Sequence, residues 1–167
     1  MKNPEVAATE ACSGLFAEAG ADALGRVLQS WYLVPDAKGA VGATAMAKAV
    51  EEARAVPSCV VTGRIGSGKR VAEVRPSVEG AAGGGVRVAR ADKERAVAFD
   101  CVSARAGAAG SVRLTVAFED QWDSEGETKL ANDYLVIAHS AARALAKELG
   151  CRDGGGLPEQ ASALPAG

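Results

Sequence analysis

The chain has 167 residues, of which 48% are hydrophobic and 24% are charged, and its formal net charge is −2. Alanine supplies 36 residues, more than valine, leucine, isoleucine and phenylalanine together, which supply 34. The small share of large apolar side chains predicts a small, tightly packed core, while the low net charge argues against a disordered chain. We therefore expect one globular domain over residues 1–150.

The sequence lacks the apolar segments of a membrane protein. No apolar run reaches the roughly 18 residues that a membrane-spanning helix needs. The start of the chain contains Lys2, Pro4 and Glu5 and leads into no apolar signal segment. These features predict a soluble protein of the cytoplasm that does not enter a membrane.

Four cysteines, Cys12, Cys59, Cys101 and Cys151, lie 47, 42 and 50 residues apart. This spacing provides no close pair of metal ligands, and His139 is the only histidine. We therefore expect no metal, no cofactor and four reduced cysteines, as in a reducing compartment.

Three segments in the N-terminal third have the apolar spacing of helices. Residues 4–19 begin with Pro4, which suits the first turn of a helix. A second stripe runs over residues 24–31, and an alanine-rich third segment over residues 44–55 stops before Pro57. The sequence predicts N-terminal helices in these three places.

From residue 58 onward, apolar and polar residues alternate, as in strands with one buried face. The loops between the alternating segments are short, which favours a five-stranded antiparallel meander between about residues 58 and 120. The segments predicted as strands are residues 59–65, 71–78, 86–88, 97–101 and 112–118.

The predicted sheet is followed by a long amphipathic segment, residues 128–150, which ends at Gly150. We expect one helix here, packed across the sheet. Residues 151–167 are rich in glycine and proline, so we expect a flexible C-terminal tail. The predicted fold class is therefore α+β, with N-terminal helices, a meander and a long C-terminal helix.

One motif carries a nucleotide-binding interpretation. Residues 63–69, Gly-Arg-Ile-Gly-Ser-Gly-Lys, resemble the phosphate loop of P-loop nucleotide-binding proteins. The resemblance implies ATP or GTP binding, with Asp100 or Asp120 near the metal. The residues that it would place around the nucleotide are Gly63, Gly66, Ser67, Gly68, Lys69 and Asp100.

The same residues also suit the turn of a β-hairpin. Arg70 stands where the P-loop family has Ser or Thr, and Pro76 limits any helix after the motif to little more than one turn. The alternation instead predicts a hairpin with Val61 opposite Val74, so that apolar residues face each other on one side. We favour the hairpin over the phosphate loop.

The middle of the chain is basic. Residues 60–95 carry eight basic and four acidic side chains, between flanks with net charges of −2 and −4. We therefore expect a non-enzymatic binding or adaptor module that contacts a protein, or an acidic or phosphate-bearing partner, through the hairpin region. The residues expected to make these contacts are Arg64, Lys69, Arg70, Arg75, Arg87 and Arg90.

No residue is predicted to be catalytic, because the sequence positions no carboxylate to orient His139. Besides nucleotide binding, a second alternative is a small apolar ligand held between the sheet and the C-terminal helix, where alanine-rich helix faces leave room. Each of the three candidate functions is compatible with a homo-oligomer.

Overall fold

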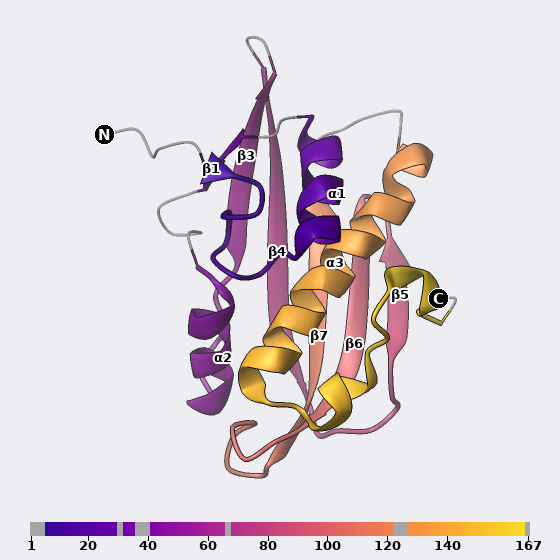
Figure 1. Ribbon diagram of the computed structural model, residues 1–167. Coiled ribbons are helices and arrows are strands. Elements are labelled where there is room, and N and C mark those ends of the chain that lie inside the picture. The colour runs from indigo at the N-terminus through magenta and orange to yellow at the C-terminus, as the bar shows by residue number, and fades with distance from the viewer. Residues whose placement is uncertain (1–5, 30–31, 36–40, 66–67, 122–126, 166–167) are drawn as a thin grey trace.

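The computed structural model describes residues 6–29, 32–35, 41–65, 68–121 and 127–165. These residues form an antiparallel sheet with three α-helices, which confirms the α+β class and the C-terminal helix (Figure 1). None of the helices in these ranges is long and apolar enough to cross a membrane. In chain order the elements are β1 (Val6–Ala7), α1 (Glu18–Leu28), β2 (Tyr32–Pro35), α2 (Ala43–Glu51), β3 (Cys59–Ile65), β4 (Gly68–Gly80), β5 (Arg87–Ala91), β6 (Glu94–Val102), β7 (Ser111–Asp120) and α3 (Glu127–Leu149).

The sheet has seven strands rather than the predicted five, in the order β1-β2-β3-β4-β7-β6-β5. The predicted meander is also wrong, because β4 pairs with β7 and not with β5. Residues 81–86 carry the chain past the ends of β7 and β6, which produces a Greek-key arrangement of β4 to β7. Alternation shows which face of a strand is buried, but it does not identify the neighbouring strand.

The predicted hairpin is confirmed, since β3 and β4 pair from Ile65 opposite Gly68, next to the turn, to Cys59 opposite Val74. The predicted register is wrong by two residues: Val61 lies opposite Ala72, and Val74 lies opposite Cys59. A slip of two residues leaves every side chain on its predicted face, because side chains alternate with period two. The turn itself, residues 66–67, lies outside the described residues.

The N-terminal segment differs most from its prediction. Residues 4–19 do not form one helix: Val6 and Ala7 form β1, and α1 begins only at Glu18. Val6 pairs with Leu33 of β2, and Cys12 has a φ of 55°, which no helix interior contains. The two other predicted helices correspond to α1 and α2.

The helices pack on one face of the sheet. Figure 1 shows α3 running diagonally across this face with α1 beside it, and α2 also contacts α3. Gly20 of α1 allows the close approach, because a Cβ at this position would lie 2.4 Å from Ser140 Oγ of α3. The core between α3 and the sheet is filled by large, fully buried side chains: Phe99, Leu114, Phe118, Tyr134, Ile137 and Leu145.

All four cysteines form disulfides, Cys12–Cys59 and Cys101–Cys151, so the prediction of reduced cysteines is wrong. The first ties the segment before α1 to the start of β3. The second ties the residue after α3 to β6. Both pairs are about 50 residues apart in sequence, and only the fold brings them together.

The C-terminal segment lies against the body of the protein, although its composition predicts flexibility. It begins with the disulfide at Cys151 and contains two short 3-10 turns, Arg152–Gly156 and Ala161–Ala163. Gly155 has a φ of +73° and packs on the ring of Phe99, where a Cβ would come within 2.5 Å of Cδ2. Glycine is required there both for the backbone conformation and for space.

Candidate functional site

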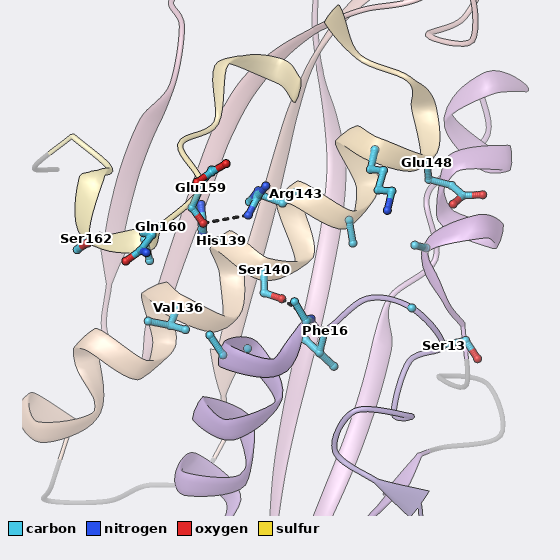
Figure 2. A pocket seen from close by; sticks show the side chains of 18 of the residues that line it. Ser13, Phe16, Val136, His139, Ser140, Arg143, Glu148, Glu159, Gln160 and Ser162 are labelled. Atoms are coloured by element: carbon cyan, nitrogen blue, oxygen red, sulfur yellow. Dashed lines mark hydrogen bonds between the residues drawn. The ribbon is translucent and has the colours of Figure 1, made fainter. Parts of the chain in front are cut away.

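A groove of about 840 Å³ runs along the side of α3 that faces away from the sheet (Figure 2). Its floor extends from Asn132 to Glu148, which is about 24 Å at 1.5 Å per residue. One wall comes from the chain before and within α1 and from the start of α2; the other comes from residues 159–162. We call this feature the α3 groove. Its floor residues are Asn132, Val136, His139, Ser140, Arg143, Ala144, Lys147 and Glu148.

The N-terminal wall is held by backbone contacts and by one disulfide. The Ala17 N–H donates to Ser140 Oγ at 2.9 Å, and the Ala43 N–H donates to the Ser13 carbonyl at 3.2 Å. Ser13 directly follows Cys12, which is bonded to Cys59. Leu15 and Phe16 are buried, so this wall also has an apolar anchor.

The C-terminal wall is held mainly by polar contacts to α3. His139 Nε2 lies 2.7 Å from the Pro158 carbonyl, and Arg143 donates to the Glu159 carbonyl at 2.9 Å. Figure 2 shows both side chains reaching from the helix toward the C-terminal segment. Leu157 and Leu164 are only partly buried. This wall therefore has a weaker apolar anchor than the N-terminal wall.

His139 makes a structural contact with the C-terminal wall. Burial lowers the pKa of the imidazole below its usual value, the hydrogen bond to Pro158 opposes this shift, and the charge of Arg143 adds to it. A carbonyl only accepts, so the imidazole carries its hydrogen on Nε2. Ser140 Oγ accepts from the Ala17 N–H, and among the described residues no hydrogen bond joins Ser140 to His139, so the two side chains do not form a nucleophile–base pair.

The groove floor carries two cations in succession. Arg143 and Lys147 are four residues apart, so they lie on the same face of α3 and repel each other. Arg143 donates to a carbonyl rather than to a carboxylate, and within the described residues Lys147 has no hydrogen bond or ion pair. The neighbouring Glu148 accepts from Thr44 Oγ1 at 3.1 Å. Because Glu148 and Glu159 also line the groove, the attraction for an anionic group is confined to the stretch beside Arg143 and Lys147.

The basic residues predicted as a binding surface do not share one face. Arg70 points toward the helices, where it donates to the Val27 carbonyl at 3.0 Å. Arg75 lies on the opposite, outer face, within 3.0 Å of Glu73 and 2.6 Å of Glu94. The side chains of Arg64 and Lys69 lie outside the described residues.

The two predicted arginines of β5 also face opposite sides. Arg87 lies opposite Ala98 on the outer face and donates to the Gly84 carbonyl at 3.3 Å. Arg90 lies opposite Arg95 on the helix side and is exposed. The structure places Arg95 beside Arg90, and the sequence did not indicate this pair.

The predicted nucleotide residues are not arranged as a phosphate loop. Gly63 belongs to β3, and Gly68 and Lys69 begin β4, a strand in the place where a phosphate loop requires a helix. Gly66 and Ser67 lie outside the described residues.

The two candidate metal carboxylates, Asp100 and Asp120, have structural partners. Asp100 accepts from the Gly83 and Gly85 N–H groups and from Arg113. Partial burial by itself raises the pKa of Asp100. These donors together lower the pKa by more than burial raises it, so the pKa lies below its usual value. Asp120 is buried and accepts from the Tyr134 hydroxyl at 2.7 Å.

Asp100 also lies far from the hairpin turn. Its partner Arg113 pairs with Gly80, twelve residues along β4 from Gly68, or about 40 Å at 3.3 Å per residue. Among the described residues, no group of three or more His, Cys, Asp or Glu could hold a metal ion.

The sequence did not indicate the α3 groove, because residues 4–19 and 151–167 were predicted as a helix and a flexible tail. The available signal was the even number of cysteines, with one beside each wall. No protein family, curated protein or solved structure was found to match this chain.

Proposed function

We propose that this protein is a non-enzymatic binding module that holds an extended segment of a partner protein in the α3 groove. The observation that carries the proposal is the length of the groove: its floor is about 24 Å long and follows four turns of one helix. An extended chain of about seven residues spans that length at 3.3 Å per residue.

The lining supports a peptide over a compact ligand. Small residues such as Ala17, Ala19 and Ala144 leave room for a backbone, and polar side chains line the groove from end to end. Arg143 and Lys147 select a segment with a carboxylate toward the Glu148 end of the bound stretch. Protein binding and preference for an acidic partner thus persist from the sequence prediction, but at another site.

The two disulfides extend the proposal to the compartment. Disulfides persist where thiols are oxidised and are rare in the cytoplasm. We therefore propose that the protein works in an oxidising compartment, in place of the cytoplasm that the sequence predicted. Thiol titration of the protein purified without reductant tests this, and four titratable thiols in the folded protein would contradict it.

Selection of random heptapeptides displayed on phage against the immobilised protein tests the groove. We expect enriched peptides to contain an acidic residue and to shift the amide resonances of α3 and residues 159–162. Ala144→Trp fills the groove and should abolish binding, whereas Ala108→Trp, in the exposed loop before β7, should not. Peptides that bind both variants equally would overturn the proposal.

A further inference from the structure

The far edge of β5 is open in the described part of the structure. β5 is the last strand of the sheet and pairs only with β6. It is also the most exposed strand, and none of its five side chains is buried. Its edge therefore presents backbone groups that no described strand uses.

The register identifies those groups. The Asp120 N–H of β7 donates to the Lys93 carbonyl, so the odd-numbered residues of β6 bond toward β7. The even-numbered residues of β6 then bond toward β5, where their partners are Arg87, Ala89 and Ala91. The N–H and C=O groups of Val88 and Arg90 consequently point away from the sheet.

The charges at this edge are unbalanced. Arg90 lies directly opposite Arg95, and like charges in that position repel. Among the residues that the structure describes, Arg95 donates to the carbonyls of Ala91 and Glu94, at 3.1 and 2.7 Å, and to no carboxylate. Within the described residues, Arg90 has no hydrogen bond or ion pair. A carboxylate placed beside Arg90 would relieve the repulsion.

We propose that the β5 edge binds an acidic, extended segment of a protein partner, which adds to the sheet as a further strand. Backbone bonds to Val88 and Arg90 would fix the segment, and its acidic side chains would supply specificity. Arg90 and Arg87 lie on opposite faces three residues apart. The matching segment therefore has two acidic residues separated by two others. This surface shares no residue with the floor of the α3 groove and does not depend on it.

Arginines on an edge strand can also prevent pairing with other strands. The two roles give opposite results with an acidic strand. If the arginines only protect the edge, they attract an acidic peptide through screened charges alone, and the peptide does not join the sheet. Removing the outward N–H of Val88 would then leave the affinity for the peptide unchanged.

A fluorescein-labelled octapeptide, Thr-Val-Glu-Val-Thr-Glu-Val-Thr, is the probe, and fluorescence anisotropy measures its dissociation constant on the full chain. We expect Arg90→Glu to weaken binding by about tenfold or more, since charge reversal turns an attraction into a repulsion. The matched charge reversal Lys48→Glu, on α2 across the molecule (Figure 1), should change binding less than twofold. The peptide with Gln in place of Glu should bind at least tenfold more weakly.

Val88→Pro provides an independent test of strand addition. It removes an N–H that points outward and leaves the β6 bonds of β5 in place, so the protein should stay folded. We expect it to weaken the octapeptide about tenfold. No binding of the octapeptide at millimolar concentration, or equal binding by wild type and Val88→Pro, would overturn the proposal. Equal affinity for single-stranded DNA, unaffected by Val88→Pro, would also overturn it and assign the arginines to a nucleic-acid surface.

Discussion

The outer face of the sheet and the α3 groove are built in different ways. On the outer face, regular strands place charges opposite one another: Arg75 is flanked by Glu73 and Glu94, and Arg113 pairs with Asp100. Around the groove, irregular segments from both ends of the chain are held by disulfides and hydrogen bonds. Arg75 and Arg113 of the outer face therefore have carboxylate partners, whereas in the described part of the chain Lys147 of the groove has none. The most regular surface of this molecule is therefore not its best candidate site.

The largest expected effect comes from removing a disulfide. Replacing Cys101 and Cys151 by alanine should lower the free energy of unfolding by about 4 kcal/mol, because the loop they close spans about 50 residues. Chemical denaturation measures the loss. Hydrogen exchange should show faster exchange in residues 157–164 and little change in residues 13–17.

The matched control removes Cys12 and Cys59 instead. Their sequence separation is 47, so the expected loss of stability is about the same, near 4 kcal/mol. Here the faster exchange should appear in the N-terminal wall. If both variants loosen the same wall, or neither wall, then the disulfides do not hold the walls separately.

A second, smaller effect tests the packing of the C-terminal segment on the sheet. Gly155→Ala should cost about 2 kcal/mol, because its Cβ would meet Phe99 and its φ is positive. Gly154→Ala is the control, with a similar φ and no atom within 4 Å of the added Cβ, and should cost about 1 kcal/mol. Equal losses in thermal unfolding would show that Gly155 does not pack on Phe99.

The third effect depends on pH and concerns only the groove. The folded pKa of His139 is lowered, so below the ordinary pKa near 6.5 the unfolded chain binds more protons than the folded one. Its contribution to stability is therefore complete at neutral pH and is lost as the pH falls through 6.5 toward the folded pKa. We expect His139→Gln to flatten the pH dependence of the unfolding free energy in this range. An unchanged pH profile would show that His139 does not cause this pH dependence.

The smallest effect is expected on the outer face. Arg75→Ala removes two ion pairs, but Arg75 is 44% exposed, so the loss should be no more than about 1 kcal/mol. Thermal unfolding at low and high salt measures it, and the difference from wild type should shrink as salt rises. A loss of several kcal/mol would show that the outer face is held more strongly than its exposure indicates.

Local patterns located β3 to β7 and the regions of α1 and α2, because each depends on the spacing of apolar residues within one segment, but they missed two strands and placed α1 at residues 24–31 instead of Glu18–Leu28. Val112, Leu114 and Val116 alternate, and their strand was found to within two residues at each end. The same patterns did not predict β1, because two residues are too few to show a period. The register of β3 and β4 was wrong by two, since either register keeps the same faces.

The sequence alone determined the α+β class, the buried face of each long strand and the single long helix after the sheet. The tertiary structure decided the strand order, the cysteine pairs and the α3 groove. Each of these joins segments far apart in the chain: Cys12 with Cys59, β4 with β7, and residues 159–162 with α3. A periodic pattern reports on one segment and its environment, whereas these contacts depend on which segments the whole fold brings together.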